Sequence, residues 1–172
     1  SNIEVLNSYQ VKKIVTACPH CFNTIKNEYP ELGGIYEVVH HSQLIDQLIN
    51  DGKLKIKADQ FNGKKITFHD PCYLGRANGE YYAPRKVIKA LRADLKEMKS
   101  CKEKAMCCGA GGAQMFKDSE KGNKEINIKR TEEAIETKSN IIAAACPFCN
   151  TMLSDGIKSL ENNKEIQVKD IS

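Results

Sequence analysis

The chain has 172 residues, of which 41% are hydrophobic and 28% charged, and its formal net charge is +4. These values are ordinary for one globular domain, or for one domain plus part of another. The lysines are scattered, aromatics make up 6% and tryptophan is absent, so no base-stacking basic face indicates nucleic-acid binding. No apolar run reaches membrane-spanning length, and we expect an intracellular domain.

The first predicted unit covers residues 12–45, where an apolar strand at Ile14 and Val15 precedes the sequence CPHC. The proline of this motif suits the first turn of a helix, because the N–H that proline lacks would have no partner there. A loop and a second strand would follow the helix. Cys18 and Cys21 are compatible with metal ligation, with a transient disulfide, or with a simple helix-opening turn.

The next strand is predicted over residues 64–70, and it leads into a loop that carries Cys72. His69, at the end of this strand, is either a hydrogen-bonding neighbour of a site at Cys72 or an ordinary strand-end residue. A helix is predicted over residues 83–92. Arg85 in this helix is expected to lie in solvent, as most charged residues do.

A short strand over residues 95–98 leads toward the sequence CCGAGG, which contains Cys107 and Cys108. Glycines in this loop allow positive φ angles and a close approach of the backbone to a bulky inorganic cofactor. These glycines are Gly109, Gly111 and Gly112. A charged helix is predicted over residues 119–138, with Ile128, Thr131 and Ile135 as its inner stripe.

The last segment, residues 139–172, repeats the pattern of the first. Its apolar strand contains Ile141 and Ile142, and its CPFC motif places Cys146 and Cys149 128 positions after the first pair. The repeat predicts an internal duplication, with residues 1–60 as the last part of a first unit and residues 61–172 as a second, nearly complete unit. We therefore expect the chain to be part of a longer polypeptide.

Strands alternating with helices indicate an α/β fold with a parallel sheet flanked by helices. In such sheets the carboxyl ends of the strands meet at one edge, so the three cysteine loops should converge there. Thiols at this spacing favour a metal site. Zinc takes four ligands, whereas five thiols with an adjacent pair suit an iron–sulfur cluster better. A zinc-stabilised interaction module and a metal-free thiol–disulfide oxidoreductase remain as alternatives.

Five cysteines in this order resemble the cysteine-rich CCG domain of heterodisulfide reductase and of the iron–sulfur subunits of glycolate and lactate oxidases. Thirty-four residues separate Cys72 from Cys107, and 37 separate Cys108 from Cys146. The phrases CPHCFNT, HDPCYLGR, CCGAGG and ACPFCNTML look closest to large bacterial iron–sulfur oxidoreductases that are often encoded with electron-transfer flavoproteins. Many relatives read CCGAGGG, whereas this chain has Ala113 at the last glycine.

The resemblance implies a noncubane 4Fe-4S cluster held by Cys72, Cys107, Cys108, Cys146 and Cys149. It also implies electron transfer between a flavoprotein, or a thiol–disulfide pair, and a quinone pool. The partners would be the other domains of the parent oxidoreductase and an electron-transfer flavoprotein. The location would be cytoplasmic, with the parent protein holding the domain at the inner face of the membrane. Whether the chain is itself an enzyme stays open, and an isolated fragment is expected to be inactive.

Overall fold

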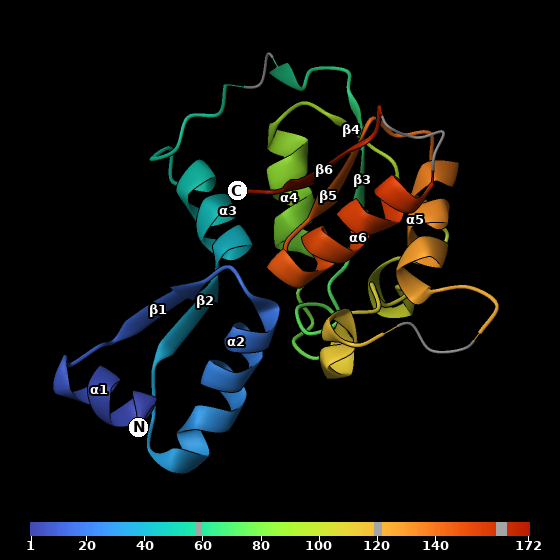
Figure 1. Ribbon diagram of the computed structural model, residues 1–172. Coiled ribbons are helices and arrows are strands. Elements are labelled where there is room, and N and C mark those ends of the chain that lie inside the picture. Colours follow the sequence, from blue (N-terminus) through green and yellow to red (C-terminus); the bar gives the residue numbers. More distant parts are fainter. Residues whose placement is uncertain (58–59, 119–121, 161–164) are drawn as a thin grey trace.

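The computed structural model of the protein describes residues 1–57, 60–118, 122–160 and 165–172. All strand pairs in this part of the chain are parallel, and helices flank them, so the predicted α/β class is confirmed (Figure 1). A small sheet pairs β1 (Lys13–Thr16) with β2 (Glu37–His40). A larger sheet has the order β4-β3-β5-β6, formed by β4 (Asp94–Leu95), β3 (Lys65–His69), β5 (Ile141–Ala144) and β6 (Gln167–Asp170).

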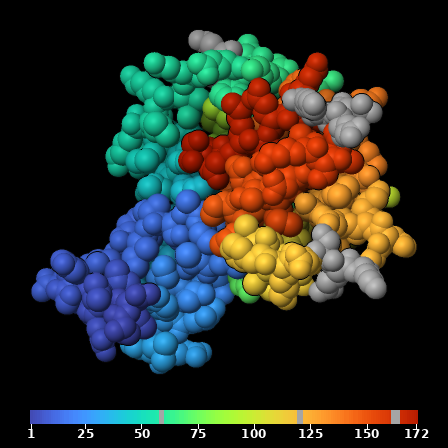
Figure 2. Space-filling view, in the orientation of Figure 1, coloured from blue at the N-terminus to red at the C-terminus, as the bar shows by residue number. Residues whose placement is uncertain are grey.

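Six α-helices surround the two sheets in the described residues. They are α1 (Asn2–Ser8), α2 (Pro19–Asn23), α3 (His41–Asn50), α4 (Tyr82–Ala90), α5 (Ile126–Glu136) and α6 (Pro147–Ser159). A π-helical turn (Thr24–Glu28) and short 3-10 turns (Tyr29–Leu32, Lys102–Lys104 and Gly111–Phe116) complete the regular structure. None of the described helices has the length and apolar character that crossing a membrane requires. The first 40 residues form a lobe that projects from the rest (Figure 2).

The core lies on both faces of the larger sheet, because successive side chains of a strand point to opposite faces. All four residues of β5 are buried, as a central parallel strand requires. Ile142 and Ala144 pack on one face against α5 and α6, whereas Ile141 and Ala143 pack on the other with Ile88 of α4. The Phe22 side chain of α2 also enters this second cluster, so the N-terminal lobe shares part of the core.

The pairing of β3 with β5 positions the loops that follow them. His69 at the end of β3 is paired with Ala144 at the end of β5, so both strands finish at the same level of the sheet. The Cys72 loop leaves from the first strand and the CPFC turn from the second. His69 therefore lies on the same face as Ala144, toward α5 and α6.

The segments that contain the two CxxC motifs have the same order of elements. In each, a strand leads into a helix with proline in its first turn, and a parallel strand follows. They differ in their helices, since α2 gives way to a π-helical turn after five residues, whereas α6 runs for 13. The internal duplication and the division near residue 60 stay predictions.

Three expectations about the central elements are corrected. The helix predicted over residues 119–138 begins at Ile126; residues 119–121 lie outside the described part, and Gly122 and Asn123, both poor helix formers, precede it. Its buried face is largely polar: Asn127, Arg130, Thr131, Glu133 and Ala134 are buried, whereas Ile128 and Ile135 are only partly so. The strand predicted over residues 95–98 is shorter, because after Leu95 the chain leaves the sheet and buries Met98 in the core.

Close packing of α5 against α6 fixes the helix that carries the second CxxC. Gly156 of α6 faces Thr131 of α5, and a methyl group added at Gly156 would lie 2.9 Å from the Thr131 Cβ and 3.2 Å from the Asn127 carbonyl oxygen. Such separations are too short for carbon atoms, so only glycine allows the two helices to approach this closely.

We expect Gly156→Ala to lower the free energy of unfolding by about 1–3 kcal/mol, the usual cost of overpacking a core. Urea denaturation followed by circular dichroism measures this change. Ser154→Ala, two residues earlier in the same helix, serves as the control and should change stability by less than about 0.5 kcal/mol. Equal stability of the Gly156→Ala variant and the wild type would show that the helices can separate at no cost.

Candidate functional site

Three loops bring five cysteine side chains together in one series, in which each thiol lies close enough to its neighbour to shift that neighbour's pKa. The neighbours in the series are Cys72 and Cys107, Cys107 and Cys108, Cys108 and Cys149, and Cys149 and Cys146. We call this series the thiol row. The row joins the loop after β3, the CCG loop and the first turn of α6, which are far apart in the sequence. Their convergence follows from the common end of β3 and β5.

Hydrogen bonds within the thiol row make its sulfurs unequal. The pKa of Cys107 lies well below its usual range because Cys108 and Cys72 both donate hydrogen bonds to its sulfur. The bond to Cys107 correspondingly raises the pKa of Cys72, and it raises that of Cys108 to about 11. At the other end, a hydrogen bond from Cys149 lowers the pKa of Cys146 to about 7. These hydrogen bonds thus favour the thiolate form at Cys107 and Cys146, and thiolates are what metals bind.

The row runs from a half-buried end to a fully buried one. Cys72 and Cys107 are partly exposed, whereas Cys108, Cys149 and Cys146 are at most 4% exposed. Buried thiolates need nearby donors or cations to offset the loss of water. The first such donor is the backbone N–H of Gly109, which lies 3.3 Å from the Cys107 sulfur.

The backbone of the CCG loop bends as predicted at two of its three glycines. Gly109 has a φ of +92° and Gly112 a φ of +63°, whereas Gly111 does not take the left-handed conformation. Ala113, where many relatives have glycine, also takes the left-handed conformation, with a φ of +60°. A glycine at this position would adopt the same conformation without steric cost.

His69 lies beside the buried half of the thiol row. One of its ring nitrogens and the sulfurs of Cys108 and Cys149 all lie within 4.8 Å of one another. Burial lowers the pKa of His69 to about 3, and the charge of Arg130 adds to this shift. The imidazole is therefore neutral at physiological pH. Its Nδ1 accepts a hydrogen bond of 3.0 Å from Nε of Arg130.

Arg130 was not identified from the sequence, although its side chain is completely buried. Its Nη1 donates to the Ser100 carbonyl at 2.8 Å and to the Glu133 carboxylate at 2.7 Å. Its Nη2 is buried and has no partner among the described residues. The one sequence signal is the pair Arg130–Glu133, three positions apart, but such pairs are common on exposed helix faces.

The first CxxC forms a separate pair at the start of α2. The Cys18 thiol is hydrogen-bonded to Cys21, and burial raises the pKa of Cys18. His20 lies between Cys18 and Cys21 in the sequence. The centroid of its ring is 4.5 Å from that of Tyr73 and 5.5 Å from that of Phe148. The first motif is thereby tied to the loop of Cys72 and to the second CxxC through aromatic contacts. Cys101 is a free, partly exposed thiol.

A buried ion-pair network holds the segment that precedes the Cys72 loop. Arg85 forms two hydrogen bonds with Asp70, of 2.7 and 2.8 Å, and two with Glu97. Asp70 also accepts from the backbone N–H of Lys102 at 2.7 Å. Arg85 is only 9% exposed, so its expected solvent position is wrong. The reason is that two carboxylates from other segments surround its guanidinium.

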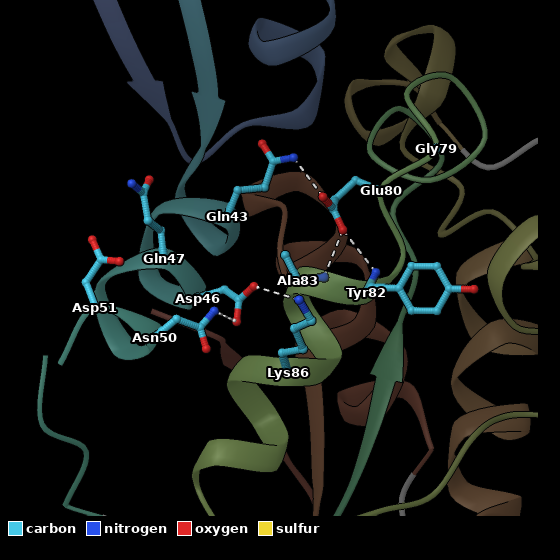
Figure 3. A pocket seen from close by; sticks show the side chains of 10 residues that line it. All are labelled: Gln43, Asp46, Gln47, Asn50, Asp51, Gly79, Glu80, Tyr82, Ala83 and Lys86. Atoms are coloured by element: carbon cyan, nitrogen blue, oxygen red, sulfur yellow. Dashed lines mark hydrogen bonds and ion pairs between the residues drawn. The ribbon is translucent and has the colours of Figure 1, made fainter.

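A separate hollow of about 540 Å³ lies between α3 and α4 (Figure 3). None of its lining residues is a cysteine or a histidine. Its charged groups are largely satisfied by each other: Gln43 donates to Glu80 at 2.7 Å, and Lys86 lies 3.3 Å from Asp46. The hollow is therefore separate from the thiol row.

The sequence of the chain is similar to one family model and to several known proteins. A family model described as CCG, cysteine-rich domain, matches residues 1–26 and 66–154. Over 99% of its length, the chain is 41% identical to the EtfAB:quinone oxidoreductase of Syntrophomonas wolfei and 43% to the probable iron-sulfur-binding oxidoreductase FadF of Bacillus subtilis. It is 38% identical to one subunit of the dihydromethanophenazine:CoB–CoM heterodisulfide reductase of Methanosarcina barkeri. The chain spans 24% of the first two relatives and 41% of the third.

The contacts within the thiol row predict which disulfides form when the metal-free protein is oxidised with diamide under native conditions. We expect disulfides within the row, such as Cys146–Cys149, and a disulfide between Cys18 and Cys21, because the thiols of each pair lie close enough to shift each other's pKa. Mass spectrometry of peptides from the oxidised protein identifies the links. Protein oxidised in urea provides the control, because an unfolded chain should form disulfides between cysteines that are not neighbours in the folded structure. Abundant native links from the row to Cys18, Cys21 or Cys101 would contradict the arrangement.

Proposed function

Because the chain belongs to the family of CCG-type cysteine-rich domains, we propose that it is an electron-transfer domain built around an iron–sulfur cluster. The observation that carries the proposal is the thiol row, in which five cysteines from three loops lie next to one another in series. When bound, a cluster of this kind would supply one-electron transfer. The proposed ligands are Cys72, Cys107, Cys108, Cys146 and Cys149.

The donor set fits an iron–sulfur cluster better than it fits zinc. A single zinc ion takes four ligands in a tetrahedron, so it would leave one thiol of the row unused. A cluster with several iron atoms can engage five cysteines, including an adjacent pair. By resemblance to heterodisulfide reductase, we propose the noncubane 4Fe-4S type. Cys18 and Cys21 are two thiols only, and we assign them no cluster within the described chain.

The surroundings of the row also suit an anionic cluster. The N–H group of Gly109 points at the Cys107 sulfur, and such donors stabilise negative charge on ligand sulfurs. Arg130 contributes a buried positive charge beside His69, with one nitrogen still unpartnered among the described residues. Hydrogen bonds, burial and nearby charge are the means by which a protein sets the reduction potential of a cluster. The glycines of the loop let the backbone approach it.

A metal-free thiol–disulfide exchange function has less support. A pKa of about 7 at Cys146 is suitable for a nucleophilic thiolate. However, Cys146 is completely buried, so a disulfide substrate would not reach its sulfur. In the first motif Cys21 is exposed, but burial raises the pKa of Cys18, which disfavours the thiolate form.

The relatives suggest a role within a larger protein. Two of them are about four times as long as this chain, and one is named for a reaction between EtfAB and quinone. We therefore propose that the domain passes electrons inside an oxidoreductase that takes them from an electron-transfer flavoprotein and delivers them to quinone. In this arrangement the domain lies on the cytoplasmic side, and other parts of the parent protein provide contact with the membrane.

Anaerobic reconstitution with iron and sulfide tests the proposal. We expect the wild type to take up iron and sulfide and to develop a visible absorption band, whereas Cys107→Ser and Cys108→Ser should lose most of this uptake. Iron and sulfide analysis, with the anaerobic spectrum, measures it. The matched control is Cys101→Ser, which removes a thiol outside the row and should load like the wild type.

Two results would contradict the assignment. If the wild type binds one zinc and no iron when both are offered, the zinc-stabilised module replaces the present proposal. If Cys107→Ser and Cys108→Ser take up as much iron as the wild type, the cluster is bound elsewhere.

A further inference from the structure

We propose that Arg130 keeps His69 out of the metal-ligand set and thereby disfavours a cysteine–histidine zinc site at the buried half of the thiol row. The inference rests on the proposed function, since it concerns which metal the row accepts. The proposed ligands are all cysteines, yet a histidine lies among them. His69, Cys108 and Cys149 offer one nitrogen and two sulfurs within 4.8 Å of one another, which resembles a cysteine–histidine zinc site.

A histidine ligates a metal through a nitrogen that carries a lone pair and no proton. The guanidinium of Arg130 has donors only, so Nδ1 of His69 must accept the 3.0 Å hydrogen bond from its Nε–H. The lone pair of Nδ1 is then occupied. The proton of the neutral ring must be on Nε2, which removes the lone pair there. Neither nitrogen of His69 is left free for a metal.

Ligation through Nε2 would require the ring proton to move to Nδ1. The N–H at Nδ1 of His69 would then face the Nε–H of Arg130, and the hydrogen bond between the two side chains would be lost. Water cannot replace this bond, because Arg130 is completely buried and His69 is 1% exposed. The loss of a hydrogen bond to a charged group corresponds to about a ten- to hundredfold weaker zinc affinity.

The position of Arg130 is itself fixed by contacts that do not involve His69. Its Nη1 is held by the Ser100 carbonyl and the Glu133 carboxylate, and Glu133 also accepts from the backbone N–H of Ser100. Rotation of Arg130 away from His69 would break these bonds inside the core. Arg130 therefore acts as a positioning residue, which restricts His69 to the role of hydrogen-bond donor at Nε2.

The first test reads the tautomer of His69 directly in the reduced, metal-free wild type by ¹⁵N NMR of the imidazole nitrogens. We expect a protonated, pyrrole-type Nε2 and an unprotonated, pyridine-type Nδ1. The His69→Gln variant assigns the signals, because the chain has only four histidines. A proton on Nδ1 would overturn the inference. This experiment needs no iron, so its result is separate from success or failure of cluster loading.

The second test measures zinc affinity by competition with a chelator. Arg130→Met should bind zinc about ten- to a hundredfold more tightly than the wild type, and the double variant Arg130→Met/His69→Phe should lose this gain. Lys86→Met is the control, since it removes an ion-paired cation of α4 that lies at the hollow beside α3, away from the thiol row; its zinc affinity should equal that of the wild type. Unchanged affinity in Arg130→Met, or a gain that persists in the double variant, would overturn the inference.

Discussion

The parallel pairing of β3 with β5 is the constraint on which the rest of the structure depends. Because His69 and Ala144 are register partners, the chain leaves both strands at the same height. Segments that lie more than 70 positions apart in sequence then start their loops side by side. The CCG loop, between β4 and α5, reaches the other two loops from the side of α5 and α6. Close packing of α5 against α6 holds the second CxxC beside the CCG loop.

The strands and the cysteine loops could be predicted because their signals are local. The apolar residues of β3 and β5 mark buried strands, and Pro147 marks the first turn of α6. The convergence of the loops needs only the general rule that parallel strands end at one edge of the sheet. What could be inferred in this way is the set of cysteines that meet, and not the hydrogen bonds among them.

The two buried arginines could not be predicted, because their partners come from distant segments. Arg85 is buried through Asp70 and Glu97, and Arg130 through His69 and Ser100. The sequence near each arginine looks like an ordinary solvent-facing helix. Of the inner stripe expected on α5, Thr131 is buried, whereas Ile128 and Ile135 are only partly so. The burial of Arg130 on this helix depends on a histidine 61 residues away, which an apolar pattern does not reveal.

The contact between Arg130 and His69 also has a consequence for how the chain folds. If β3 shifted by one residue against β5 so that Phe68 paired with Ala144, its side chains would exchange faces, and Phe68 would point at Arg130 in place of His69. The Nε–H of Arg130 would then lose its acceptor, although Nη1 keeps the Ser100 carbonyl and the Glu133 carboxylate. Leaving a buried donor without a partner costs about 1–3 kcal/mol. Isoleucine and phenylalanine alone would tolerate such a slip better, since either face would bury apolar surface. The polar pair therefore favours the observed register over this slip, and in the observed register the loops of Cys72 and CPFC start side by side.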